Sequence, residues 1–344
     1  MKPPAKDSVL FWKTARDFLD HYLPEMRNAS HNTMDAYRQS LNHFIDYLET
    51  EKHVARKSMA FQEFSRQNIG DYLVWMHSQK ELAAKTCNLR ITAIRSFMEY
   101  ASQENKELMV YYNEACSIKG LKTERNAIEF LERKAMKALL TAPDISLVKG
   151  RRNRMLLILL YDSAARVQEI VDLRLCDLHL DSDTPFLTIY GKGRKYRNVP
   201  LMEKTVSHLK NYLKEFYPTS GLKETLPLFY SLRDGKPHAL STDTIDLMLK
   251  KYATAVRTRC PEMPENIHCH MIRKTRAMDL YQESIPLVHI MQLLGHENIS
   301  TTSGFYAFAT LETLRNSLQK TNPSNQQSEK LWKNKKTLNQ LYRL

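Results

Sequence analysis

The chain has 344 residues, enough for two domains that each bury a core, and its 42% apolar and 26% charged residues exclude an intrinsically disordered protein. No apolar run approaches the ~18 residues of a membrane helix, no signal-peptide segment is visible, and five scattered cysteines argue against a disulfide framework, so we expect a cytoplasmic protein. The net charge of +13 favours a polyanionic partner, nucleic acid before an anionic membrane.

Residues 8–105 have the apolar spacing of a helical bundle, and only nine glycines in the chain indicate few tight turns. Helical periodicity runs through four segments, near residues 12–22, 37–48, 69–76 and 89–100. We expect their aromatic and methionine stripes to form core. Thr86 is a candidate N-cap of the fourth helix. Arg90 and Arg95 lie off the apolar stripe of this helix. We expect them either to be solvated surface residues or to contact phosphates.

Residues 106–128 are polar and irregular, and we interpret them as an interdomain linker whose Lys119 and Lys122 would follow a nucleic-acid backbone. A second periodic region covers residues 129–322. Helices are predicted at 131–142, 151–162, 166–174, 202–216, 241–257, 270–283, 286–294 and 310–319. One β signal interrupts them, a hairpin formed by 186–190 and 197–201. Residues 323–344 are predicted to be a flexible tail with a short docking helix.

Several chemistries are excluded by their missing motifs, namely the phosphate-binding P-loop, the dinucleotide-binding glycine pattern and the Gly-x-Ser-x-Gly elbow. Cys260, His268, Cys269 and His270 are soft metal ligands by type. However, adjacent residues such as Cys269 and His270 rarely face one ion, and a spaced second pair is missing. We therefore predict neither a metal nor a cofactor.

A set of cationic and hydrogen-bonding side chains at turns and helix starts is followed by one tyrosine. Its members are Arg166, Lys192, His270, Arg273, His296 and Tyr306. Lys192 would occupy the tip of the hairpin, and His270 and Arg273, three residues apart, would share a helix face. Each also has an ordinary explanation: Arg166 as a partner of Glu169 or Asp172, Lys192 as an exposed turn residue, and Tyr306 as a core ring.

Taken in order, an arginine, a hairpin lysine, His-x-x-Arg, Leu-Gly-His and a tyrosine resemble the motifs of the tyrosine recombinase (phage integrase) family. Residues 166–174 resemble its first-arginine box, 191–201 its β-hairpin box and 293–302 the approach to its nucleophile. The resemblance implies a mainly α fold with a small β-sheet, built from a SAM-like core-binding domain (8–105) and a catalytic domain (129–322).

Three departures from the family pattern stand out. Ala164 replaces an expected glycine, Lys274 follows Arg273 where a histidine is common, and one extra residue separates His296 from Tyr306.

The resemblance implies a cofactor-free enzyme that cuts and rejoins DNA through a 3′-phosphotyrosyl intermediate and a Holliday junction. Tyr306 would be the nucleophile, because a phenolate both attacks and leaves readily. Arg166 and Arg273 would neutralise the nonbridging phosphate oxygens. Lys192 would protonate the leaving 5′ oxygen. His270 would relay the proton of the tyrosine and His296 would donate to a phosphate oxygen.

The implied partner is double-stranded DNA with specific recombination sites. The side chains expected to bind DNA are Thr86, Arg90, Arg95, Lys119, Lys122, Arg194 and Lys274. We expect a homo-oligomer, a tetramer in the synapse and a monomer or dimer when free, with an accessory DNA-bending protein and no membrane. We expect a cytoplasmic, nucleoid-associated protein.

The expected role is that of a mobile-element integrase or transposon recombinase, rather than a chromosome-dimer resolvase, because tail and linker depart from the compact housekeeping form. Two alternatives remain open. One is a catalytically silent DNA-binding accessory protein, and the other is an activity like that of type IB topoisomerases.

Overall fold

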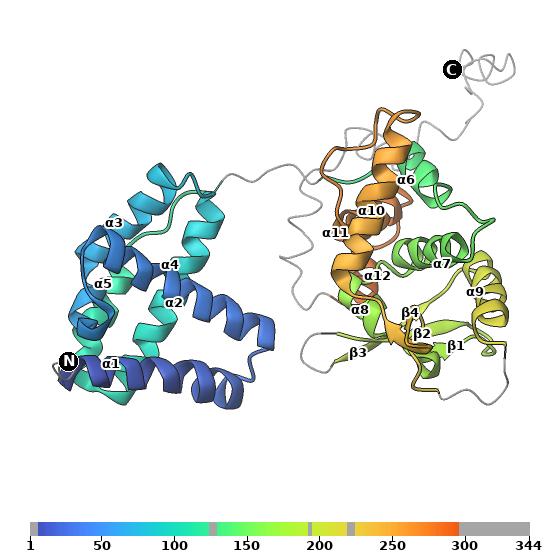
Figure 1. The fold of residues 1–344 in the computed structure, drawn as a ribbon. Helices are drawn as coiled ribbons and strands as arrows, with labels where there is room; N and C mark the ends of the chain where they lie inside the picture. Colours follow the sequence, from blue (N-terminus) through green and yellow to red (C-terminus); the bar gives the residue numbers. More distant parts are fainter. Residues whose placement is uncertain (1–5, 124–128, 192–194, 219–223, 296–344) are drawn as a thin grey trace, which may run out of the picture. The chain divides into compact units, whose positions relative to one another are not determined.

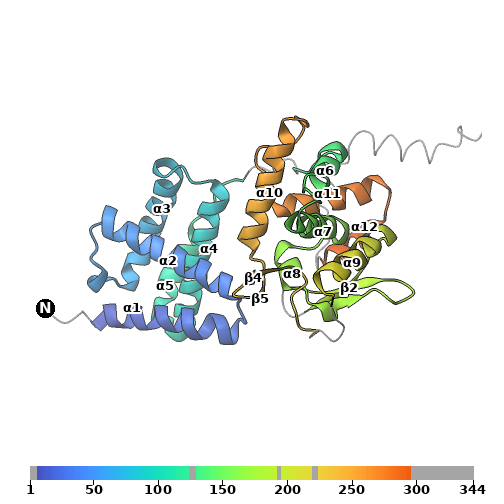
Figure 2. The same cartoon turned by 45° about the vertical axis from the view of Figure 1, so that its right-hand side comes forward.

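The computed structural model describes residues 6–123, 129–191, 195–218 and 224–295, and the chain divides into two compact units, residues 1–126 and 127–344. Figures 1 and 2 show helices in both units and strands in the second. Within the described ranges, no helix has the length and apolar character needed to cross a membrane.

The first unit is a helical bundle around aromatic side chains. Its helices are α1 (Lys6–Asp17), α2 (His31–Glu51), α3 (Arg66–Val74), α4 (Ala84–Glu104) and α5 (Met109–Ser117), with π-helical segments at Phe18–Met26 and Trp75–Gln79 and 3₁₀ turns at Arg56–Ser58, Phe61–Phe64 and Lys106–Leu108. Pro24 lies in the first π-helical segment and cannot donate a backbone hydrogen bond there. Phe11, Phe18 and Phe97 are almost fully buried, and the Phe97 ring packs edge-on against Phe11 and tilted against Phe18. The expected core role of the aromatic stripes is confirmed.

Two details of the first unit differ from the sequence predictions. Ala83 holds the N-cap position of α4, so Thr86 lies inside the first turn and is not a cap. Residues 106–117, predicted as linker, form a 3₁₀ turn and α5, and belong to the first unit. Leu108 and Ala115 are buried in the core of the first unit, and Tyr111 and Tyr112 pack against it, whereas Met109 and Val110 are exposed. The apolar residues of this short segment are consecutive and so give no clear helical period.

The second unit contains α6 (Arg133–Leu140), α7 (Val148–Ser163), α8 (Val167–Asp172), α9 (Glu203–Phe216), α10 (Thr242–Arg257), α11 (Cys269–Gln282) and α12 (Leu287–Leu294). These agree with seven of the predicted helices, and the eighth, 310–319, lies outside the described residues. An antiparallel sheet has the order β1 (Leu178–His179), β2 (Phe186–Tyr190) and β3 (Tyr196–Pro200). Its register sets Ile189 opposite Arg197 and Tyr190 opposite Tyr196.

A second hairpin, β4 (Tyr230–Arg233) and β5 (Lys236–Ala239), contradicts the prediction of a single β signal. Its turn holds Asp234 at φ +49° and Gly235 at φ +72°. Two residues with positive φ are typical of the tight turns that join antiparallel strands, and Asp-Gly is a common pair for them. The signal for this hairpin was therefore present in the sequence.

The end of α7 shapes the entrance to α8. Ala164 caps α7 in the left-handed conformation, with φ +48° and ψ +28°. This conformation is the one that glycine adopts most easily, so the backbone here is of the kind that the expected glycine would favour. The Ala164 methyl group is fully buried against Ala277, Ile290 and Leu294. Its packing offsets part of the conformational cost.

Candidate active site

Arg166 is the N-cap of α8 and donates two hydrogen bonds to the carboxylate of Glu169. Its backbone N–H donates to Glu169 Oε2 at 2.8 Å, and its Nη1 donates to Oε1 at 2.8 Å. A glutamate three residues after the N-cap satisfies a backbone donor that the helix leaves free. The Glu169 side chain is 5% exposed, whereas Arg166 is 41% exposed. One side of the Arg166 guanidinium thus remains accessible to solvent.

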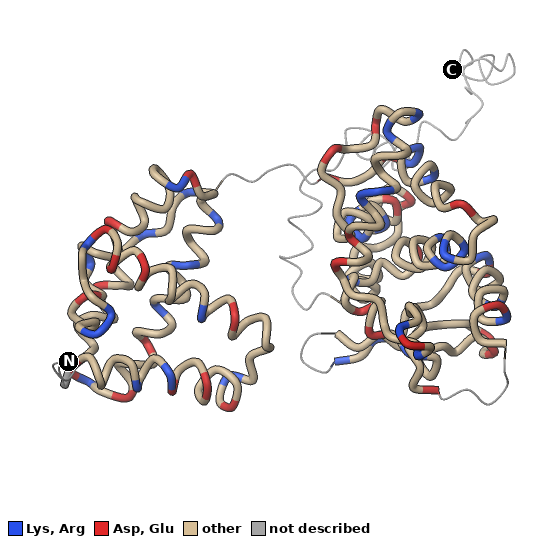
Figure 3. Tube along the Cα trace, in the orientation of Figure 1, with Lys and Arg blue, Asp and Glu red and all other residues tan. Residues whose placement is uncertain are grey.

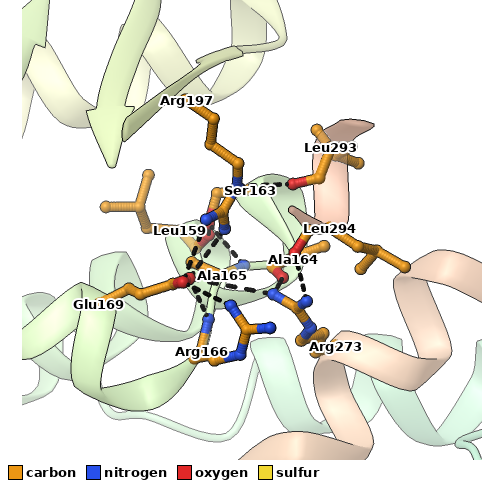
Figure 4. A network of polar contacts seen from close by, with 10 residues as sticks. All are labelled: Leu159, Ser163, Ala164, Ala165, Arg166, Glu169, Arg197, Arg273, Leu293 and Leu294. Atoms are coloured by element: carbon orange, nitrogen blue, oxygen red, sulfur yellow. Dashed lines mark hydrogen bonds and ion pairs between the residues drawn. The ribbon is translucent and has the colours of Figure 1, made fainter. Parts of the chain in front are cut away.

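Arg273 reaches the same carboxylate from α11, more than a hundred residues later. Its Nη1 donates to the carbonyl of Ala164 at 2.8 Å and lies 3.9 Å from Glu169 Oε2, and its Nη2 donates to the carbonyl of Leu294. The side chain is 2% exposed. Arg273 therefore holds the C-terminal ends of α7 and α12 beside Glu169 (Figure 4).

Arg197 on β3 is the third guanidinium around Glu169. Its Nη1 and Nη2 donate to the two carboxylate oxygens at 3.0 and 2.8 Å, and its Nε donates to the carbonyl of Leu293 at 2.9 Å. Figure 4 shows the guanidinium groups of Arg166, Arg197 and Arg273 turned toward Glu169. We call these four residues the Glu169 cluster.

The Glu169 cluster concentrates positive charge at a buried position. Burial alone would raise the pKa of Glu169, but hydrogen bonds from Arg197 and from the Arg166 backbone outweigh it and lower the pKa to about 2. Burial, followed by the charges of Arg166 and Arg197, lowers the pKa of Arg273 to about 9 despite the favourable charge of Glu169. Three cations thus face one anion, and a phosphate beside them would supply further negative charge.

His270 stands in the first turn of α11, one helix turn before Arg273. His268 caps this helix, and its ring accepts a hydrogen bond from the N–H of Met271 at 3.2 Å. Although the His270 side chain is exposed, desolvation by the atoms around the ring, followed by the charges of Arg273 and Lys274, lowers its pKa to about 4. Without DNA, the imidazole is therefore neutral at neutral pH and able to accept a proton.

Of the predicted site residues, the structure brings Arg166, His270 and Arg273 together. Lys192, Arg194, His296 and Tyr306 lie outside the described residues. The residues that precede two of them are described. The N–H of Gly191 donates to the carbonyl of Lys195 at 2.7 Å and closes the hairpin, and Gly295 ends α12 at φ +61°.

The candidate DNA-binding residues differ in their surroundings. Thr86, Lys119 and Lys122 are exposed, whereas Lys274 and Arg90 are half-buried. Arg95 donates through Nε to the carbonyl of Ala115 at 3.1 Å and through Nη2 to that of Ile118, so it supports the end of α5. Figure 3 shows acidic residues among the basic ones in both units.

The four residues considered as metal ligands, Cys260, His268, Cys269 and His270, do not form a metal-binding cluster. In the described part of the chain, no three His, Cys, Asp or Glu side chains are close enough to hold an ion. Cys269 is buried, and burial raises the pKa of its thiol. Its backbone N–H donates to Asp246 Oδ1 at 3.3 Å.

Sequence reasoning missed the importance of Arg197. The hairpin prediction included it only as a strand residue. On β3, Val199 two residues later is fully buried, so Arg197 lies on the inward face of the strand. A charged residue at an inward position needs a buried partner, and this was the available signal.

Comparison with known proteins agrees with this geometry. Residues 129–312 match the Phage integrase family, and residues 17–105 match the Phage integrase, N-terminal SAM-like domain. The chain therefore belongs to the phage integrase family, the tyrosine recombinases, which cleave and rejoin DNA.

Individual relatives support the assignment. A Sinorhizobium fredii protein named as an integrase/recombinase, y4rC, is 32% identical over 88% of both chains. Tyrosine recombinase XerD of Staphylococcus saprophyticus is 29% identical, over 80% of this chain and 88% of that protein.

Solved structures share the fold. The XerH site-specific recombinase bound to a palindromic difH substrate aligns with a TM-score of 0.65 at 21% identity, covering 92% of this chain and 90% of that one. A Tn1549 transposon integrase bound to circular intermediate DNA gives a TM-score of 0.66 at 15% identity, covering 89% and 98%.

Proposed function

We propose that this chain cuts and rejoins double-stranded DNA at specific sites through a covalent bond between Tyr306 and the 3′ phosphate of the cut strand. The Glu169 cluster is the observation that supports this most. Arg166 and Arg273 meet there beside His270, although helices far apart in the sequence carry them. Two planar, charged guanidinium groups suit the nonbridging oxygens of a phosphate under attack, on which negative charge increases.

The proposed step conserves the energy of the phosphodiester. The Tyr306 oxygen forms a bond to phosphorus while the bond from phosphorus to the 5′ oxygen breaks, so no cofactor is needed. The phenolic proton passes to His270, and Lys192 supplies a proton to the departing 5′ oxygen. His296 donates to a nonbridging oxygen. Attack by the 5′ hydroxyl of another strand reverses the step and leads through a Holliday junction.

A synaptic tetramer on two duplexes is the proposed assembly. A lambda integrase tetramer bound to a Holliday junction aligns with this chain at a TM-score of 0.60 and 16% identity, covering 86% of this chain and 76% of that one. The net charge of +13 and the exposed Lys119 and Lys122 suit the DNA backbone. We infer a cytoplasmic, nucleoid-associated protein that cooperates with a DNA-bending protein.

The proposed biological role is movement of a mobile element. The relative named integrase/recombinase and the transposon integrase fold support this role, whereas the XerD relatives point to a second possibility. Deletion of the coding sequence distinguishes the two. We expect excision and integration of a flanking element to stop, whereas accumulation of chromosome dimers would contradict the mobile-element role.

The decisive experiment is trapping of the covalent intermediate. The site would be selected by binding of the full chain to a random duplex library and rebuilt as a nicked suicide duplex. Wild-type protein should form a denaturation-resistant adduct. Tyr306→Phe should bind with unchanged affinity and form none, because only the hydroxyl is lost. Arg166→Ala and Arg273→Ala should slow cleavage by about 10²–10³.

Three results would contradict the proposal. An adduct formed by Tyr306→Phe would place the nucleophile elsewhere. Tight binding by the wild type without any adduct would favour a silent accessory protein. Relaxation by a monomer of a supercoiled plasmid that lacks the selected site would favour a topoisomerase.

A further inference from the structure

Arg197 is a charged residue on an inward strand position. It lies on β3 opposite Ile189, which is 1% exposed, and its own side chain is 13% exposed. A charge at such a depth is costly unless its donors are satisfied. Its contacts therefore show what the fold uses it for.

Arg197 joins three segments of the second unit. Two nitrogens donate to Glu169 in α8, the third donates to the carbonyl of Leu293 in α12, and the backbone belongs to the hairpin. A bidentate pair fixes both distance and orientation, because the guanidinium is planar and rigid. Any shift of β3 along its axis would break these bonds.

Two glycines lie directly against Arg197 and precede residues of the proposed reaction. A side chain built on Gly191 would lie 3.7 Å from Arg197 Nη1 and 3.6 Å from Glu169 Oε1. One built on Gly295 would lie 3.0 Å from Arg197 Nη1. The next residues in the chain are Lys192 and His296.

We propose that Arg197 is a positioning residue: anchored by Glu169 and by the end of α12, it sets the hairpin, and with it Lys192, against Arg166 and Arg273. This rests on the proposed function, since it assumes that Lys192 takes part in cleavage. Arg197 itself touches neither DNA nor a reacting atom in this proposal. It acts through Glu169, Gly191 and Gly295.

The test is a double-mutant cycle between Arg197→Gln and Lys192→Ala, read as single-turnover cleavage of a suicide duplex by the full chain. We expect Arg197→Gln to cleave about 10–100-fold more slowly, the scale of a misplacement of about 1 Å, with site affinity changed less than threefold. If Arg197 acts through the hairpin, the double variant should cleave no more slowly than Lys192→Ala alone. Multiplied defects would overturn the proposal.

Arg151→Gln is the matched control. Arg151 also donates to both oxygens of a carboxylate, that of Glu215, away from the Glu169 cluster. Arg151→Gln should leave the cleavage rate within about twofold of the wild type. In the double variant, the small rate defect of Arg151→Gln should multiply with that of Lys192→Ala, because the two sites are independent. Equal defects for Arg151→Gln and Arg197→Gln would reduce Arg197 to a general stabilising role and overturn the proposal. If Arg197→Gln does not fold, Arg197→Lys enters the same cycle.

A duplex with sulfur at the 5′ bridging position separates this proposal from the proposed function. A thiolate leaves without a proton, so the defect of Lys192→Ala should largely vanish on it. The defect of Arg197→Gln should shrink to the same extent. If the Lys192→Ala defect persists on the sulfur duplex, Lys192 is not the acid, but the double-mutant cycle still tests whether Arg197 acts through it. If only the Arg197→Gln defect persists, the positioning role is overturned.

Discussion

Two arginine–carboxylate pairs in the second unit share their chemistry and differ in their surroundings. Arg197 donates to both oxygens of Glu169, and Arg151 donates to both oxygens of Glu215. Each arginine also donates to a backbone carbonyl of a neighbouring segment. However, the side chains of the first pair are 13% and 5% exposed, and those of the second are 36% and 35% exposed.

This difference decides what each pair contributes. An exposed pair gains little, because water screens it and competes for its donors. A buried pair gives little net stability either, yet it is costly to break, because the partner left behind keeps a desolvated charge. Glu169 is thus a required anion for three cations, whereas Glu215 braces α7 against α9.

The largest expected effect is the difference in stability between a variant without the Glu169 carboxylate and one without the Glu215 carboxylate. Glu169→Ala should lower the free energy of unfolding by about 3–5 kcal/mol, because it leaves Arg197 and Arg273 buried without an anion. Glu215→Ala should cost less than about 1 kcal/mol. Urea denaturation at neutral pH measures both. Equal losses would show that burial does not distinguish the two pairs.

The pH dependence of stability should follow the same carboxylate. Its pKa in the folded protein is about 2, against 4.5 for an ordinary glutamate. Since the folded pKa is lowered, the ionised form contributes stability that is complete above about pH 4.5 and is lost as the pH falls toward 2. The contribution is roughly 3 kcal/mol. In Glu169→Gln, the urea midpoint should depend less on pH in this window than in the wild type. In Glu215→Gln, the midpoint should still fall with pH as it does in the wild type.

His270 should act in a separate window. Its pKa is lowered from 6.5 to about 4 in the folded protein, so between these values the unfolded chain binds the extra proton. Stability should therefore fall as the pH drops from 6.5 to 4, and His270→Gln should remove that slope and no other. Loss of the slope below pH 4 in this variant would contradict the assignment.

Two glycines with positive φ extend the comparison to a smaller expected effect, because one lies against Arg197 and the other does not. Gly295 and Gly235 both have positive φ, +61° and +72°, but a side chain on Gly295 would lie within 3.3 Å of the Arg197 guanidinium, and one on Gly235 would meet nothing within 4 Å. Gly235→Ala should cost about 1 kcal/mol from backbone strain alone and leave cleavage unchanged. Gly295→Ala should cost more, about 2 kcal/mol, and slow cleavage at least tenfold. Equal effects on cleavage would show that Arg197 tolerates displacement.

The sequence was sufficient for the parts of the fold that repeat a pattern. Helical periodicity located α9 and α10 within a few residues, because long amphipathic segments leave many consistent signals. It failed for α5, whose nine residues carry one deeply buried position, Ala115. It also missed the β4–β5 hairpin, although Asp234-Gly235 is a turn signal.

For the site, the residue types and their order predicted Arg166, His270 and Arg273, and the fold brings them together. Of the contacts that hold them, the sequence indicated only the pairing of Arg166 with Glu169, as an ordinary explanation of that arginine. Arg197 pairs with Glu169 across 28 positions, and the carbonyls that bind Arg273 come from the ends of two helices. Such contacts depend on where chain segments end in space, and no local pattern encodes that.

The smallest expected effect concerns Ala164, where the sequence departs from the family glycine. Ala164→Gly should relieve a left-handed residue, worth about 1–2 kcal/mol. It should also lose a buried methyl group, worth about 0.8 kcal/mol, and gain about 0.5–1 kcal/mol of chain entropy in the unfolded state. The opposing terms nearly cancel, so the free energy of unfolding should change by less than about 1 kcal/mol.

Ala165→Gly is the control, because Ala165 is equally buried and has no positive φ. It should lose both the methyl burial and the entropy term with nothing to offset them, about 1–2 kcal/mol. Cleavage by Ala164→Gly should stay within about threefold of the wild type, since the Ala164 carbonyl that binds Arg273 belongs to the backbone and is kept. If Ala164→Gly loses as much stability as Ala165→Gly, the left-handed residue stores no strain, and the methyl packing against Ala277 and Ile290 alone explains why alanine is tolerated there.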